Sequence, residues 1–220
     1  MTAPATSFRH RQRQMREEAI LEAAHRLLAE KGFQGMTMDE LAARVGIAKG
    51  SLYQHFRSKE ELLGVALVSF MDRISEYVDS LSPAQPAIER LKQTYRRALH
   101  LRFQEGFPDI FNAKSLIKES LNQQPVYAAA ANRLVKALAG LVDTAKKQGD
   151  VMQDIPTEVL VYAAIGRMRD PELDPLIADG RIQPEALVEM LVQMFLGGVV
   201  TDWQRSKMRR LPAQRVSTAP

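Results

Sequence analysis

The sequence contains no cysteine among its 220 residues. This absence excludes disulfide scaffolds, thiolate-ligated metal sites and cysteine nucleophiles, and it is consistent with a reducing cytoplasm. The N-terminus is rich in arginine and lacks the apolar core segment of a signal peptide. The most apolar run, residues 186–200, is interrupted by Glu189 and Gln193 and is shorter than the ~20 residues that a membrane-spanning helix needs. We therefore expect a soluble cytoplasmic protein.

Patterns typical of catalysis and metal binding are also scarce. The four histidines are scattered along the chain. Glu22 and His25 have the spacing of carboxylate-bridged metal helices, but such a site needs a second pair and further carboxylates, which we do not find. No glycine-rich phosphate loop follows a strand, and no nucleophile elbow is present. We therefore predict that the protein is not an enzyme and has no catalytic residues, metal site or cofactor.

Positive charge gathers at the two ends of the chain. The net charge is +4, and the composition is otherwise ordinary, with 45% hydrophobic and 25% charged residues. Residues 1–16 and 203–220 contain several arginines or lysines and no acidic residue. We predict a basic flexible arm at residues 1–14 and a basic flexible tail at residues 208–220.

Apolar residues recur at helical spacing along nearly the whole chain, and no stretch alternates with period two. We therefore expect an all-α fold of about nine helices without a sheet. A linker is expected at residues 82–86 and a loop with one helical turn at residues 170–180. The expected helices cover about residues 15–31, 37–45, 48–56, 59–81, 87–105, 108–122, 126–148, 156–168 and 184–207.

The stretch at residues 36–59 contains two short helical patterns joined by a tight turn. Thr37 and Glu40 have the spacing of a capping box, which places the start of the first helix at Thr37. Gly46 stands where this helix needs a left-handed residue to end. The second helix, at about residues 48–56, has hydrogen-bond donors on its outward face. This arrangement is typical of helix-turn-helix proteins, whose second helix lies in the major groove of DNA.

Residues 15–65 also resemble the DNA-binding domain of the TetR family of bacterial transcriptional regulators, in order and spacing and without gaps. The matching segments are residues 20–24, 27–33, 37, 41–42, 45–46, 50–56 and 59–62. The rest of the chain resembles the family only in outline, as a divergent helical domain for ligand binding and dimerisation. The resemblance implies a three-helix DNA-binding domain at residues 15–65, joined by a long helix to a helical bundle domain at residues 66–207.

The resemblance also implies which residues contact DNA: Thr37, Arg44, Lys49, Gly50, Ser51, Tyr53, His55 and Lys59. Physical chemistry supports these roles, because a helix N-terminus binds phosphate and lysine pairs with the acceptors of guanine. At Gly50, where the family often has a larger residue, the contact would come from the backbone. Three alternatives stay open: Tyr53 as a half-buried core aromatic, His55 as a satisfied surface histidine, and Lys59 as only a neighbour of a capping box. The basic N-terminal arm either reaches the DNA or is a solvated tail.

Larger apolar side chains in the middle helices are candidates for an effector pocket, since such pockets are mostly apolar with a few polar groups. We expect His100, Arg102 and Arg167 to supply the polar groups. The same pattern is also that of an ordinary core. The candidate pocket residues are Tyr95, Leu99, Phe103, Phe107, Phe111, Leu116, Tyr127 and Met168.

Two expected helices, residues 156–168 and 184–204, have apolar residues over more of their circumference than one core contact buries. We predict that they join two copies of the chain in a four-helix bundle across a two-fold axis. The alternative is a helix buried inside a single chain. The predicted dimer interface contains Val159, Tyr162, Leu187, Leu191, Met194, Phe195 and Val199.

The function expected from the resemblance is a transcriptional regulator, in most members a repressor. It binds a palindromic DNA operator as a homodimer and is released by a small-molecule effector in the C-terminal domain. The alternative is a helix-turn-helix regulator without an effector, which is controlled by a partner protein or by its own abundance.

Overall fold

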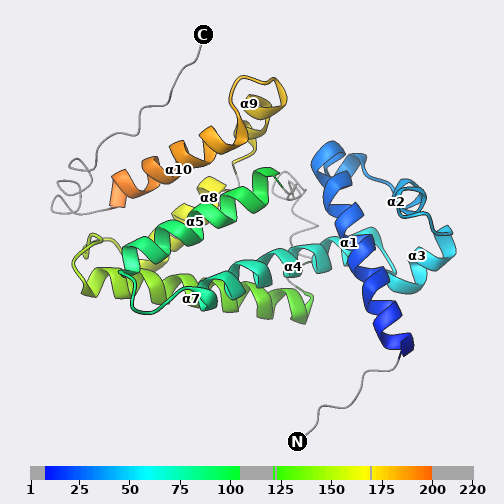
Figure 1. The fold of residues 1–220 in the computed structure, drawn as a ribbon, viewed down its shortest axis with the longest axis horizontal. Helices are drawn as coiled ribbons and strands as arrows, with labels where there is room; N and C mark the ends of the chain where they lie inside the picture. The colour runs from blue at the N-terminus through cyan, green and yellow to red at the C-terminus, as the bar shows by residue number, and fades with distance from the viewer. Residues whose placement is uncertain (1–7, 105–120, 122, 169, 200–220) are drawn as a thin grey trace, which may run out of the picture.

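The computed structural model describes residues 8–104, 121, 123–168 and 170–199, and every regular element in this part of the chain is a helix. Figure 1 shows two groups of helices. Helices α1, α2 and α3 form the first group, and α5, α7, α8 and α10 belong to the second. Helix α4 (Lys59–Ser80) runs from one group into the other. The all-α prediction is confirmed, and no helix in the described residues is long and apolar enough to cross a membrane.

The first group consists of α1 (Phe8–Gly35), α2 (Met38–Val45) and α3 (Lys49–His55). Their apolar faces meet in a core with fully buried side chains from each helix and from α4: Ile20, Leu27, Leu41, Leu52, Leu62 and Leu63. The helical pattern at residues 20–28 predicted this inner face of α1. The three helices therefore form one unit that rests on the first turns of α4.

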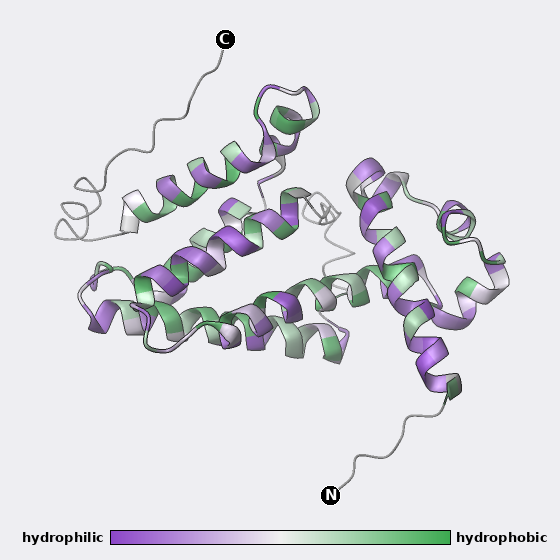
Figure 2. Cartoon of the chain, in the orientation of Figure 1, coloured by the Kyte–Doolittle hydropathy of each residue, from purple (hydrophilic) through white to green (hydrophobic). Residues whose placement is uncertain are grey.

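Helix α1 differs from the prediction at both ends. It begins at Phe8, although we expected residues 1–14 to be a flexible arm. No proline or glycine interrupts residues 8–14, and Arg13 pairs with Glu17 one turn later at 2.9 Å. Figure 2 shows that this first part of α1 is largely hydrophilic. At the other end, Gly32 has φ 65° and ψ 175°, so α1 is kinked there and one more turn follows before Gly35.

The predicted roles of Thr37 and Gly46 at the two ends of α2 are confirmed. The Glu40 backbone N–H donates to the Thr37 hydroxyl oxygen at 3.2 Å, and Gly46 ends the helix with φ 75° and ψ 33°. The start of α4 is capped in the same way, because the Glu61 N–H donates to the Ser58 hydroxyl oxygen at 3.0 Å. These short-range signals fix where the helix-turn-helix begins and where it joins the second group.

The second group contains α5 (Ala87–Gln104), α7 (Pro125–Lys147), α8 (Thr157–Met168) and α10 (Pro184–Val199). Helix α4 packs on α7 and α5, and its side along α7 is mainly hydrophobic (Figure 2). The expected helix at residues 108–122 falls almost entirely outside the described residues. The structure therefore shows a bundle in which α5 contacts α4, α7, α8 and α10.

Residues 170–180, predicted as a loop with one helical turn, contain the 3-10 helix η1 (Pro171–Leu173) and the short helix α9 (Asp174–Ala178). Arg102 of α5 holds this segment. It is 8% exposed, donates to both carboxylate oxygens of Asp174 at 2.6 and 3.0 Å, and donates to the Asp170 carbonyl at 3.3 Å. Arg102 thus turns inward as expected, but it binds a carboxylate of its own chain.

Helix α10 is tied to α5 by a second arginine. The Arg96 side chain donates two hydrogen bonds to the two carboxylate oxygens of Glu189, at 2.5 and 2.9 Å. The hydrogen bond from Arg96 lowers the pKa of Glu189, against the opposing effect of its partial burial. This bidentate pair joins α10 to α5 beside the buried apolar side of α10.

Candidate functional site

Helix α3 has one side in the core and one side in solvent. Leu52 is fully buried and Phe56, just after the helix, is 4% exposed. On the other side Lys49 and Gly50 are exposed, and Tyr53 is 41% exposed. Tyr53 is therefore a surface residue rather than the half-buried core aromatic that the sequence left open. A rigid short helix with an exposed lysine and tyrosine is suited to contacts with a large polar partner.

Lys49, the first residue of α3, has an acidic partner on α2. Its ammonium lies 2.7 Å from one carboxylate oxygen of Asp39 and 2.9 Å from the other. This hydrogen bond raises the pKa of Lys49, so the side chain stays charged at neutral pH. Both side chains are more than half exposed. The sequence did not predict this pair, because Asp39 and Lys49 belong to different helices.

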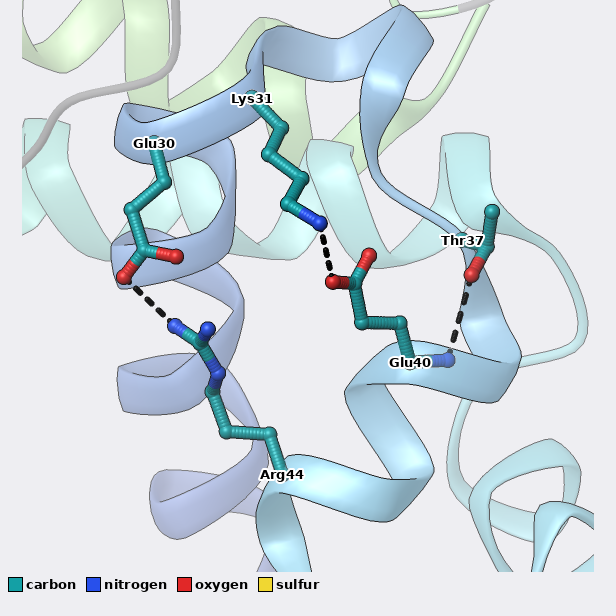
Figure 3. Close-up of polar contacts among 5 residues, drawn as sticks. All are labelled: Glu30, Lys31, Thr37, Glu40 and Arg44. Carbon is teal, nitrogen blue, oxygen red and sulfur yellow. Dashed lines mark hydrogen bonds and ion pairs between the residues drawn. The ribbon is translucent and has the colours of Figure 1, made fainter.

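Two further ion pairs join α1 to α2 on the same unit (Figure 3). Arg44 donates to the Glu30 carboxylate at 2.6 Å, and Lys31 is paired with Glu40. The Glu40 carboxylate thus points to α1 and does not return to the cap as a full capping box would require. Arg44, which we expected at DNA, is held beside α1 by a carboxylate. These exposed pairs contribute little to stability and can exchange their partners.

Thr37, Gly50 and Ser51 occupy the places that the prediction requires. Thr37 is exposed at the N-terminus of α2, where its hydroxyl oxygen already accepts one backbone hydrogen bond. Gly50 is exposed, and a Cβ atom added there would meet no atom within 4 Å. Ser51 is partly exposed beside it. The backbone of α3 at Gly50 is therefore open to close approach by a partner.

His55 and Lys59 are oriented differently from the expectation. The His55 side chain is only 11% exposed, and its Nδ1 lies 3.1 Å from a carboxylate oxygen of Glu17. The ammonium of Lys59 lies over the Phe33 ring, 4.4 Å from its centre, and burial lowers its pKa. His55 is thus mostly buried with an acidic partner on α1, whereas the alternative that the sequence left open was a satisfied histidine at the surface. In this structure both residues contact side chains of α1.

The helical bundle contains a small cavity of about 40 Å³. Its walls come from α4, α5, α7, α8 and α10 and are almost wholly apolar. The described lining residues are Ile74, Leu91, Thr94, Tyr95, Ala98, Leu134, Leu138, Val142, Leu160, Val161, Ala164, Ile165, Met168 and Phe195. By the usual volume that one water needs, this space holds about three waters.

Only two of the predicted pocket residues line this cavity, Tyr95 and Met168. Leu99 is fully buried in the core away from it, and Phe103 lies beneath the Arg102 guanidinium at 4.4 Å. Tyr127 packs against the core without lining the cavity. Phe107, Phe111 and Leu116 lie outside the described residues. The sequence missed the other lining residues because their helical spacing is the same as that of any core residue.

Apolar side chains are exposed on α8 and α10. Val159 is 53% and Tyr162 is 59% exposed on α8, and Met190 and Met194 are 49% and 62% exposed on α10. Met190 was not among the predicted interface residues. Large apolar side chains exposed together are typical of protein–protein contacts.

The other predicted interface residues need correction. Leu187 and Leu191 are 4% and 3% exposed and pack into the core of their own chain. Phe195 is partly buried, and its ring lies 4.9 Å from that of Tyr95 at the cavity. The apolar side of α10 that these residues share with Val188 and Val192 is buried against the bundle, and the Arg96–Glu189 pair lies beside this contact. The side chain of Val199 lies outside the described part of the structure.

Comparisons with known proteins agree with this geometry. Residues 20–66 match the model for bacterial regulatory proteins of the tetR family. The regulator EthR of Mycolicibacterium smegmatis is 25% identical over 189 residues, which cover 84% of this chain and 86% of EthR. The repressor KstR2 of Mycobacterium tuberculosis is 37% identical over 78 residues, but these cover only 35% of this chain and 39% of KstR2.

Solved structures show the same fold over most of the chain. The regulator FadR of Bacillus subtilis in complex with stearoyl-CoA has a TM-score of 0.62 at 17% identity, with 82% of this chain and 98% of that chain covered. AibR in complex with isovaleryl coenzyme A and operator DNA has a TM-score of 0.57 at 25% identity, and the match covers 81% of this chain and 97% of AibR. The family match falls on the α1–α4 unit that presents α3, and relatives over the longer spans are transcriptional regulators. This α1–α4 unit is that of the TetR family of bacterial regulatory proteins, and most of the chain is similar to transcriptional regulators that carry it.

Proposed function

We propose that this regulator binds a palindromic DNA operator as a homodimer, represses transcription in the cytoplasm, and releases the operator when a small molecule enters its helical bundle. The observation that carries the proposal is the exposed face of α3, with Lys49, Gly50 and Tyr53 held outward by the buried Leu52. In this proposal residues 15–65 bind DNA, and residues 66–207 bind the effector and the second copy.

Each exposed residue of the unit has a chemical role at DNA. Lys49 donates to guanine acceptors, Ser51 bonds to a base edge, and Tyr53 lays its ring on sugar or on a thymine methyl. Thr37 and the N-terminus of α2 bind a phosphate. Arg44 and Lys49 exchange their carboxylate partners for DNA as the complex forms. Lys59 contacts phosphate only if its ammonium leaves the Phe33 ring. His55 does so only if its side chain leaves Glu17.

The second copy supplies the other half of the operator. The exposed apolar residues of α8 and α10, Val159, Tyr162, Met190 and Met194, would be covered in a two-fold dimer. Two copies of α3 then reach half-sites about 34–36 Å apart, which is one turn of DNA or a multiple of it. A palindromic operator matches this symmetry.

The effector acts through α4. Ile74 of this helix lines the cavity, whereas Leu62 and Leu63 near its start lie in the core where α4 contacts α1. A molecule that widens the cavity pushes on α4 and shifts the unit that carries α3. The solved relatives in complex with stearoyl-CoA and isovaleryl coenzyme A support a small-molecule effector for this fold.

One observation favours the alternative, a regulator without an effector. The cavity of about 40 Å³ is far smaller than the roughly 300–1,000 Å³ of usual ligand pockets. In that case a partner protein or the abundance of the regulator would set repression. The two proposals share the DNA-binding surface and differ only in the bundle.

A gel-shift titration of the promoter region next to its own gene tests the function. We expect binding that weakens steeply as salt rises, because several phosphates are neutralised per dimer. An unrelated duplex of the same length should bind at least about 1,000-fold more weakly. Equal affinity for both duplexes would contradict sequence-specific regulation. A screen of metabolites for release of the bound DNA then separates the effector proposal from the alternative.

Asp39→Asn is expected to increase affinity for unrelated DNA by about two- to fivefold, because Lys49 loses its carboxylate partner and becomes free for phosphate. The slope of log affinity against log salt should steepen by about one unit per protomer. The control Asp39→Glu keeps the charge and should bind like the wild type. An unchanged slope in Asp39→Asn would show that Lys49 does not approach the DNA backbone.

A further inference from the structure

A tyrosine in the cavity wall has a buried hydroxyl without a hydrogen-bond partner. Tyr95 of α5 lines the cavity and is 7% exposed, and its hydroxyl has no hydrogen bond to any described residue. Native proteins rarely leave a buried hydroxyl unsatisfied, because each such group lowers stability. An unpaired group of this kind at a cavity wall is expected where a bound molecule completes the hydrogen bond.

The rest of the wall restricts what that molecule can be. Thr94 is the other polar residue among the described lining residues, and its hydroxyl already donates to the Arg90 carbonyl at 2.8 Å. No described lining residue is charged. A charged group buried here would lack a counter-ion, at a large cost in free energy.

One cation acts on Tyr95 from outside the lining. Arg167 of α8 exerts an electrostatic effect on the tyrosine, but its side chain is 50% exposed and pairs with Asp170 at 3.5 Å. Burial raises the pKa of Tyr95 to about 12, so the hydroxyl keeps its proton at neutral pH and can donate it. Among the described lining residues, the wall therefore offers one neutral donor in apolar surroundings.

We propose that the part of the effector that enters this cavity is uncharged and apolar, and that the Tyr95 hydroxyl holds it by donating to a single oxygen. A ketone, ester or thioester carbonyl has this chemistry, whereas a free carboxylate or an ammonium does not. The inference rests on the proposed effector control of the protein.

The cavity must widen for such a molecule to enter. Its present volume of about 40 Å³ accommodates only a few waters. Phe195 of α10 lies against the Tyr95 ring and is only partly buried, so its movement enlarges the space next to the hydroxyl. Helix α4, through Ile74, forms another wall and is displaced by the same expansion.

The test uses four probes with the same eight-carbon skeleton: methyl hexyl ketone, octanoate, octylamine and octane. Each is titrated into the full-length protein, and binding is followed by calorimetry and by the rise in melting temperature. We expect the ketone to bind best and the two charged probes worst. Tyr95→Phe should lower the affinity for the ketone by about tenfold, since it removes one hydrogen bond. The affinity for octane should be unchanged.

The melting temperatures of the ligand-free wild type and Tyr95→Phe variant give a second test. Because the Tyr95 hydroxyl has no partner, Tyr95→Phe without ligand should melt at the same temperature as the wild type or higher. The control Tyr127→Phe changes a tyrosine away from the cavity and should bind the ketone like the wild type. Stronger binding of octanoate or octylamine, an unchanged ketone affinity in Tyr95→Phe, or no binding of the ketone would each overturn the inference.

A gel shift with the same probes separates this inference from the proposed function. Binding of the ketone that depends on Tyr95 but does not alter DNA affinity supports the site and contradicts effector control by it. Release of DNA by the ketone that is equal in wild type and Tyr95→Phe supports effector control and contradicts the role of Tyr95.

Discussion

Replacing both Tyr162 and Met194 with glutamate is expected to convert the dimer into monomers and to lower affinity for the operator by at least about 100-fold. In a two-fold interface each substitution places a carboxylate opposite apolar or like-charged groups of the second copy, at a cost of several kcal/mol. Without dimerisation, one helix-turn-helix binds one half-site, and the gain from simultaneous binding of both half-sites is lost.

Sedimentation measures the mass of the variant, and a gel shift measures its affinity for the operator. The single chain should keep its fold, because both side chains are more than half exposed within one chain. The matched control is Val126→Glu on α7, an apolar residue that is 67% exposed and outside the proposed interface. A double variant that remains dimeric would place the interface elsewhere. The mass of the wild type, measured in the same way, should be that of a dimer.

Replacing both Lys49 and Tyr53 with alanine should reduce operator affinity by about 100-fold or more without loss of the dimer. Each contact with a base or its sugar is worth about 1–3 kcal/mol, and the dimer loses both contacts in each half-site. Both side chains are exposed in the free protein, so their removal leaves no cavity in the core. The effect should therefore fall on DNA binding and spare stability.

The measurement is the affinity for operator and for unrelated DNA at several salt concentrations, with circular dichroism to follow helix content. Lys136→Ala on α7 is the control, because it removes the same charge from an exposed position in the other group of helices. If the double variant binds the operator with unchanged affinity, α3 does not lie in the DNA interface. A large fall in melting temperature would instead show that Tyr53 packs in the core.

The features that the sequence predicted well depend on residues close together in the chain. Thr37 and Ser58 accept hydrogen bonds from the N–H groups three residues later, and Gly46 adopts the left-handed conformation that ends α2. Such contacts are set by spacing within one turn of helix, so a single sequence suffices to predict them. The position of α3 and its buried Leu52 followed from the same local signals.

Contacts between helices could not be predicted in this way. The partners of Lys49, Arg44 and His55 are Asp39, Glu30 and Glu17, which are 10, 14 and 38 residues away in the chain. Which carboxylate meets which cation depends on the angle between the helices. The sequence placed His55 at the surface, as a phosphate contact or as a satisfied histidine, and only the tertiary structure showed that it is mostly buried beside Glu17 of α1.

By itself the sequence determined that the chain is helical, where its helix-turn-helix begins and ends, and that α8 and α10 carry more apolar surface than one core contact buries. Only the tertiary structure decided which side of these helices stays exposed. Leu187 and Leu191 are buried in the core and Met190 and Met194 stay outside, and the Arg96–Glu189 pair joins α10 to α5 at the edge of this contact. The tertiary structure also left the Tyr95 hydroxyl without a partner, because hydrogen bonding at a buried position depends on atoms from several helices that spacing along one helix does not specify.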